Sequence, residues 1–144
     1  MSDAKIIYAK TIGSSQAWPL VVRGMAELME AGYSDDRGGF SVGWDYQVVY
    51  AVKAGTAVAC IAYVKQDWAN QYYIGLSWTE PSMRGFGLHT ALWSDLVKRA
   101  TADGVARILG SIHVNNEPML MTAHHFKRRP VATIFAYDVA TAPE

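Results

Sequence analysis

The chain has 144 residues, of which 51% are apolar, and its thirteen basic and thirteen acidic residues cancel to no net charge. This length and composition predict one globular domain, residues 1–144, with a substantial core, and they exclude a disordered chain. The charge balance argues against broad binding to nucleic acid or to a membrane surface.

The N-terminal part predicts a strand followed by a helix. The strand is expected over Lys5 to Ile12. Ser14 or Ser15 then caps a helix that has Pro19 in its first turn, and Gly32 ends it. Apolar residues recur at helical spacing from Trp18 to Met29, which predicts one broad buried stripe.

The segment from Tyr33 to Asp45 is the least regular part of the chain. Its three glycines and mixed charges predict a loop. Asp35, Asp36 and Asp45 either attract a cationic amine or are solvated turn residues.

Two apolar runs, Tyr46 to Lys53 and Thr56 to Lys65, predict a hairpin joined through Ala54 and Gly55. The second run contains Cys60, the only cysteine, which excludes an intramolecular disulfide and is typical of a reducing compartment. Because its neighbours are apolar, we expect a buried thiol rather than a nucleophile.

A turn over Asp67 to Asn70 leads to a further strand from Tyr72, and then to Arg84-Gly85-Phe86-Gly87. A helix follows, with Leu88, Leu92 and Leu96 on one face and Gly104 at its end. Glycines between a strand and a helix either make a simple turn or expose N–H groups beside the positive end of the helix, which suits a phosphate or pyrophosphate.

The C-terminal part predicts a strand over Ala106 to His113, parallel to its predecessor after the helical crossover. Asn116 is a good N-cap, and Pro118 fits the first turn of a helix that ends near His125. A strand-like stub, Phe126 to Arg129, and a last strand, Val131 to Val139, are expected after it.

The stretch Thr-Glu-Pro, two residues, then Arg-Gly-x-Gly resembles the acyl-CoA pyrophosphate loop of the GNAT N-acetyltransferase superfamily. That family's signature is Gln/Arg-x-x-Gly-x-Gly/Ala. Arg84 and Gly87 match it, whereas His89 stands where the family has a small residue. His89 either points away, donates to a phosphate, or marks a weakened cofactor site.

The resemblance implies an α/β (α+β) fold of the GNAT-like acyl-CoA N-acyltransferase type: a central, mixed, mostly antiparallel twisted sheet flanked by helices. It also implies acetyl-CoA as co-substrate and a primary amine of a small molecule or protein as acceptor. The cofactor-binding residues implied are Leu76, Ser77, Trp78, Thr79, Met83, Arg84, Gly85, Phe86, Gly87, Leu88, His89, Thr90 and Asn116. Asn116 either holds the pantetheine arm or only caps its helix. No metal is expected.

The residues for proton transfer are less defined. Similar enzymes place a tyrosine on the last helix to protonate the departing thiolate, but Met121 or Ala123 stands there. His124 is the candidate acid, although a histidine at a helix end also interacts favourably with the helix dipole. Glu80 and His113 are the candidate bases, and a mechanism in which water alone accepts the proton is equally permitted.

Two other classes of function compete with an acetyltransferase. One is a catalytically inactive GNAT-like domain that binds CoA or another protein. The other is a nucleic-acid binder that uses Lys127-Arg128-Arg129, although three adjacent charges more often form a solvated face. We expect no nucleic-acid partner.

The location and assembly of the protein are also predicted. No apolar segment reaches the ~18 residues that span a bilayer, and no signal-peptide pattern is present. We therefore expect a cytoplasmic protein without a membrane partner. Phe135 and Tyr137 in the last predicted strand offer a surface for a homodimer.

Overall fold

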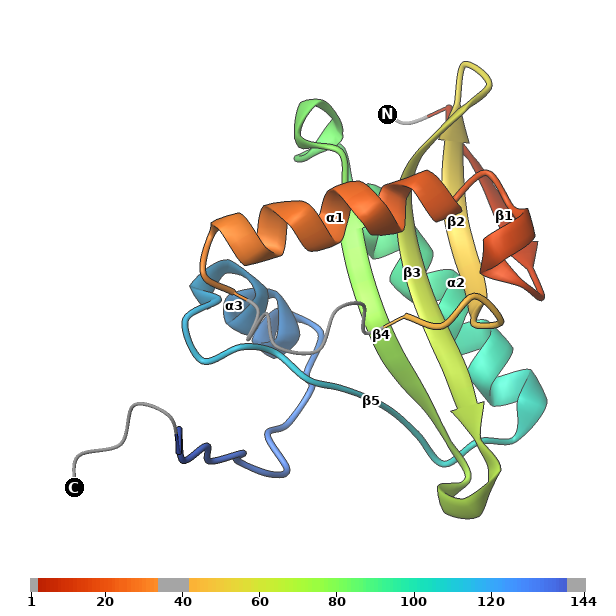
Figure 1. Ribbon diagram of the computed structural model, residues 1–144. Coiled ribbons are helices and arrows are strands. Elements are labelled where there is room, and N and C mark those ends of the chain that lie inside the picture. Colours follow the sequence, from red (N-terminus) through yellow and green to blue (C-terminus); the bar gives the residue numbers. More distant parts are fainter. Residues whose placement is uncertain (1–2, 34–41, 140–144) are drawn as a thin grey trace.

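The computed structural model describes residues 3–33 and 42–139, and Figure 1 shows one twisted sheet with helices on both faces. The strands are β1 (Lys5–Ala9), β2 (Gln47–Lys53), β3 (Thr56–Gln66), β4 (Gln71–Thr79) and β5 (Arg107–Gly110), in that spatial order. The helices are α1 (Trp18–Glu30), α2 (Leu88–Asp103) and α3 (Glu117–His125). All neighbouring strands are antiparallel except β4 and β5. The predicted fold class is confirmed.

The β2–β3 hairpin follows directly from its turn residues. Ala54 and Gly55 have φ angles of 51° and 79°. Two consecutive positive φ angles define the type I′ turn, whose twist matches that of the strands it joins. The predicted hairpin is therefore confirmed.

α1 and α2 cover opposite faces of the sheet (Figure 1). The α1 side buries Leu20, Val21 and Met25 together with Leu76 and Trp78 of β4. The α2 side buries Leu88, Leu92 and Leu96 against inward-facing residues of β2 and β3. Because side chains alternate along a strand, Ser77 of β4 faces the α2 side while its neighbours face α1.

α1 approaches the sheet most closely at Gly24. A Cβ atom built on this residue would lie 2.9 Å from Cγ of Trp78 and 3.2 Å from Cδ2 of Leu76. Only a glycine fits at that separation, so this residue sets the distance between α1 and β4.

The predicted ends of α1 are partly confirmed. Gly32, at φ 76°, follows the helix, and the N–H of Tyr33 donates to the carbonyl of Leu28 at 2.8 Å, as in a Schellman motif. The predicted serine cap is wrong: Ala17 is the N-cap residue. Ser15 instead stabilises the turn before α1, because its Oγ accepts a hydrogen bond from the N–H of Ala17 at 3.1 Å.

Two predicted strands are shorter than expected. β1 ends at Ala9, because the chain then turns so that the N–H of Ile12 donates to the carbonyl of Tyr46 at 2.7 Å. β5 ends at Gly110 rather than at His113.

The predicted last strand, Val131 to Val139, is wrong. The segment has no regular secondary structure and no strand partner among the described residues, and Ile134 and Phe135 are 85% and 90% exposed. β-branched and aromatic residues favour a pleated, half-buried surface, but a strand forms only where a neighbour accepts its hydrogen bonds. The stub Phe126 to Arg129 is not a strand either: it closes α3, with the N–H of Arg128 donating to the carbonyl of Ala123 at 2.9 Å.

β4 and β5 separate along their length, and this separation creates the space for a site. Their parallel pairing runs only from Gln71–Arg107 to Ile74–Gly110. β4 then continues to Thr79 with β3 as its only strand partner among the described residues, after a register shift between the Tyr63–Ile74 and Ala62–Leu76 pairs. A bulge of this kind bends a strand. The edge of β4 beyond Ile74 is therefore left free of β5.

Among the described residues, no helix combines the length and the apolar character that crossing a membrane requires.

Candidate active site

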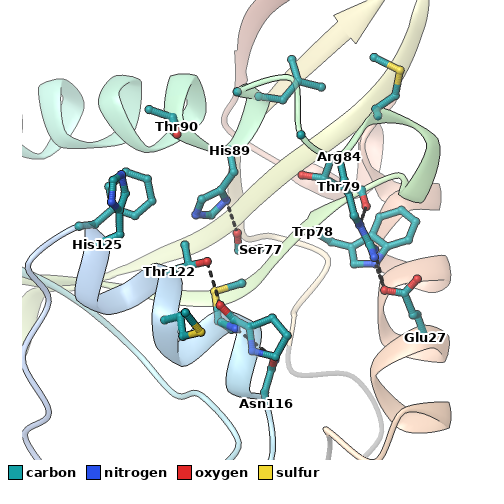
Figure 2. Close-up of a pocket in the computed structure, with 18 of the residues that line it drawn as sticks. Glu27, Ser77, Trp78, Thr79, Arg84, His89, Thr90, Asn116, Thr122 and His125 are labelled. Atoms are coloured by element: carbon teal, nitrogen blue, oxygen red, sulfur yellow. Dashed lines mark hydrogen bonds and ion pairs between the residues drawn. The ribbon is translucent and has the colours of Figure 1, made fainter.

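A pocket of about 600 Å³ lies where β4 and β5 separate (Figure 2). Four parts of the chain form its wall: the end of β4, the loop into α2 with the first turn of α2, the α3 region, and the C-terminal end of α1. The lining residues are Glu27, Leu28, Tyr33, Ser77, Trp78, Thr79, Met83, Arg84, Gly85, Gly87, Leu88, His89, Thr90, Asn116, Pro118, Met119, Met121, Thr122, His125 and Phe126.

The loop before α2 offers a row of backbone N–H groups. Gly85 and Gly87 have φ angles of 85° and 80°, which a residue with a side chain adopts only with strain. The first N–H of α2 with a backbone acceptor is that of Ala91, which donates to Gly87 at 3.0 Å. Within the described residues, the N–H groups from Gly85 to Thr90 have no acceptor. Such a row at a helix N-terminus suits an anion.

The side chain of Arg84 is held away from this row of N–H groups. Its Nη2 lies 2.6 Å from Oε1 of Glu27, and its Nε donates to the carbonyl of Thr79 at 2.9 Å (Figure 2). Glu27 also accepts from Nε1 of Trp78 at 3.2 Å. Hydrogen bonding from Arg84 is the main cause that lowers the pKa of Glu27, with Trp78 adding to it. Arg84 therefore ties the loop to α1, and the anion-binding capacity of the loop comes from its main chain.

His89 points from the start of α2 toward β4 (Figure 2). Its Nδ1 lies 2.9 Å from Oγ of Ser77, and its ring lies 5.6 Å from that of Phe126. Burial is the main cause that lowers the pKa of His89, and the charge of Arg128 lowers it further. The imidazole is therefore neutral at pH 7. It forms part of the floor of the pocket between β4 and α3 rather than standing free beside the glycines.

Asn116 caps α3, as one of its two predicted roles requires. Its Oδ1 accepts the N–H of Met119 at 3.2 Å. The residue also lines the pocket, so contact with a bound ligand is compatible with capping.

Two of the thirteen predicted cofactor-binding residues are not part of the wall. The side chain of Leu76 is buried against α1. Phe86 is 55% exposed, with Nζ of Lys53 lying 5.7 Å from its ring centroid.

The three predicted catalytic side chains also lie outside the wall. Glu80 pairs with Arg23 at 3.2 Å, and Nδ1 of His113 accepts the N–H of Asn115 at 3.0 Å. His124 is exposed on α3, one residue before His125, which does line the pocket. Of the three aspartates considered for an amine, Asp35 and Asp36 lie outside the described residues, and Asp45 is exposed away from the wall.

Sequence reasoning missed the contributions of α1 to the site. Glu27 and Tyr33 line the pocket although they are distant from the glycine loop in the chain. The only signal for Glu27 was a carboxylate at the edge of an otherwise apolar helical stripe, which a surface residue would give equally well.

Comparisons with known proteins agree with this geometry. A family model for the acetyltransferase (GNAT) family matches residues 18–126. A search of curated protein sequences finds no significant match.

Several solved structures are similar in fold. An aminoglycoside acetyltransferase from an uncultured soil metagenomic sample, in complex with sisomicin, is 13% identical with a TM-score of 0.67, over 94% of this chain and 96% of that one. The aminoglycoside N-acetyltransferase AAC(6')-Iy, in complex with CoA, is 13% identical with a TM-score of 0.67, over 93% and 98%. N-acetylglutamate synthase from Neisseria gonorrhoeae, complexed with coenzyme A and N-acetyl-glutamate, is 15% identical with a TM-score of 0.60. The match covers 84% of this chain but spans only 28% of the synthase chain.

Proposed function

The chain belongs to the acetyltransferase (GNAT) family, and from this we propose that it transfers an acetyl group from acetyl-CoA directly to a primary amine. The observation that carries the proposal is the opening between β4 and β5, bordered on one side by the acceptor-free N–H groups of Gly85 to Thr90. An anion site and a pocket of about 600 Å³ next to it match a pyrophosphate with a pantetheine arm.

The cofactor is proposed to lie along the wall from the loop toward β4. The N–H groups of Gly85 to Thr90 would hold the pyrophosphate. The free edge of β4 from Ser77 to Thr79 would bind the pantetheine arm and the thioester carbonyl through its main chain, opposite Asn116. Bound acetyl-CoA supplies the activated acyl group, and the protein holds its carbonyl carbon within reach of the amine.

The acceptor is proposed to enter beside α1. The carboxylate of Glu27 and the guanidinium of Arg84 form an ion pair at the pocket wall in this region, so a polar acceptor would meet both charges. The solved structures similar in fold include an aminoglycoside acetyltransferase and an N-acetylglutamate synthase, which support a small amine as acceptor. They also include a ribosomal-protein-alanine N-acetyltransferase, which supports a protein amine.

The roles predicted for Glu80, His113 and His124 stay predictions. None of the three side chains lines the pocket, so each would act through a water or after a movement of its segment. Glu80 adjoins Thr79, which lines the pocket, and is the candidate for a base acting through water.

Calorimetric titration with acetyl-CoA and with CoA tests the binding half of the proposal. Gly87→Glu places a negative side chain at the proposed pyrophosphate site and should abolish binding. Gly55→Glu is a matched control, because Gly55 has nearly the same φ, 79° against 80°, and the same open space around its Cβ position, but lies in the β2–β3 turn. Equal affinity in the two variants would refute the assigned site.

Thiol release in the presence of a panel of primary amines tests the transfer half. Binding without transfer to any amine would favour the alternative of a catalytically inactive domain that binds CoA or another protein. No observation in the structure or the comparisons favours that alternative.

The exposed segment 131–139 supports a proposal about assembly and location. Four of its apolar side chains, those of Ile134, Phe135, Tyr137 and Val139, are 76–90% exposed. We propose that in a cytoplasmic homodimer this segment pairs with a second copy. Deleting residues 130–144 should then convert a dimer to a monomer in sedimentation velocity, and a full-length monomer would contradict the proposal.

A further inference from the structure

We propose that Ser77 and His89 form a proton shuttle, which carries the proton of the attacking amine to the departing thiolate of CoA. This inference rests on the proposed acetyl transfer and assigns the residues that would complete its chemistry.

The geometry places both groups where the reaction would occur. Ser77 lies on β4 three residues beyond Ile74, at which the pairing with β5 ends. Its Oγ lies 2.9 Å from Nδ1 of His89, and both residues line the pocket (Figure 2). A hydroxyl on the free edge of the strand thus connects the pocket to a half-buried imidazole behind it.

The surroundings of His89 favour its neutral form, which can accept a proton. The groups that contact the ring or act on its charge are Ser77 from β4, Phe126 at the end of α3, and Arg128 after that helix. Burial first, and the charge of Arg128 second, lower its pKa below the ordinary value of 6.5. In the tautomer that carries its proton on Nε2, the neutral ring accepts the hydroxyl proton of Ser77 at Nδ1.

The proposed step balances without another reactant. The amine nitrogen attacks the thioester carbonyl, a C–N bond forms, and the π electrons move to oxygen. The ammonium proton of this intermediate passes to Oγ of Ser77 while the Ser77 proton passes to Nδ1 of His89. The C–S bond then breaks as the carbonyl reforms, and the same pair returns a proton to the thiolate. The net result is one proton moved from nitrogen to sulfur.

The other candidates fit this task less well. Met121 and Ala123, which stand where similar enzymes have a tyrosine, carry no transferable proton. Glu80 is paired with Arg23 at 3.2 Å and lies outside the wall. His125 lines the pocket but is exposed, and no hydroxyl is bonded to its ring among the described residues.

The test uses purified full-length protein with acetyl-CoA and hydroxylamine, a small generic amine that needs no tailored acceptor site. In Ser77→Ala and His89→Gln we expect kcat to fall about 100-fold, the lower range of what positioned proton transfer contributes, with little change in the acetyl-CoA affinity measured by calorimetry. Ser77→Thr keeps the hydroxyl and should retain most of the rate. Ser14→Ala is the matched control, because the Ser14 hydroxyl bonds only locally, to the carbonyl of Thr11.

Two readouts separate proton transfer from a merely structural hydrogen bond. Added imidazole should restore activity to His89→Gly, where it can occupy the vacated space, but not to Ser77→Ala. The wild-type rate, divided at each pH by the fraction of hydroxylamine that is unprotonated, should fall as the pH drops through the lowered pKa of His89, because a protonated ring accepts nothing. His89→Gln should lose this acid limb.

The possible failures are distinguishable. A wild-type protein that binds acetyl-CoA but transfers nothing to hydroxylamine refutes acetyl transfer, and the shuttle with it. A wild-type protein that transfers acetyl while Ser77→Ala and His89→Gln match Ser14→Ala leaves the proposed function standing and overturns the shuttle alone.

Discussion

Replacing Gly24 by alanine should destabilise the protein, although alanine is the better helix former. In a free helix the change would stabilise by about 1 kcal/mol. Here the new Cβ would lie 2.9 Å from Cγ of Trp78 and 3.2 Å from Cδ2 of Leu76, so α1 must move away from β4. Overpacking of this kind typically costs about 1–3 kcal/mol. The two effects together predict a net loss of about 1 kcal/mol, or a Tm lower by about 4 °C.

A second variant in the same helix isolates the packing cost. Ala26 is exposed, so Ala26→Gly should lose only the helix-propensity contribution, about 1 kcal/mol. Urea unfolding of both variants then gives the packing cost as the sum of the two losses in stability. The reasoning is refuted if Gly24→Ala gains as much stability as Ala26→Gly loses, because that result would mean that α1 does not touch Trp78.

Gly24→Ala should also change the candidate active site. Trp78 lines the pocket and donates to Glu27, which holds Arg84. A displaced α1 should therefore weaken acetyl-CoA binding in calorimetry, whereas Ala26→Gly should leave it unchanged.

Two further predictions follow from buried or paired groups. Burial raises the pKa of Cys60 to about 12, so the thiol of the native protein should not react with a thiol reagent at pH 8. It should react once the protein is unfolded in urea. Stoichiometric labelling of the native protein would contradict a buried thiol. Arg84 lowers the pKa of Glu27, so the ionised carboxylate stabilises the fold above its ordinary pKa of 4.5, and this contribution is lost as the pH falls through the lowered value. The free energy of unfolding, measured in urea between about pH 6 and 3, should therefore fall less with pH in Glu27→Gln than in the wild-type protein. The exposed Glu30→Gln is the control. If both variants lose stability with pH to the same extent, the Glu27–Arg84 ion pair does not stabilise the fold.

Local chemistry in the sequence determined several parts of this protein. The Ala54-Gly55 turn, the Gly32 and Gly104 helix ends, and the glycine loop before α2 were predicted from residues that act within a few positions of themselves. The leucine stripe of α2 likewise determined which face of that helix is buried, because helical period needs no knowledge of the partner. Together with the resemblance of the glycine loop to the GNAT family, these features predicted the fold, and the anion site that they indicate stays a prediction.

Only the tertiary structure decided how the pocket is completed. The direction of the His89 side chain depends on its hydrogen bond with Ser77 of β4. The side chain of Arg84 forms an ion pair with Glu27 of α1, which lies fifty-seven residues away in the chain. The segment Val131 to Val139 has the composition of a strand, yet no described strand lies beside it. Propensity and spacing are short-range properties of the chain, whereas ion pairs, strand partners and the separation of β4 from β5 depend on which distant residues the fold brings together.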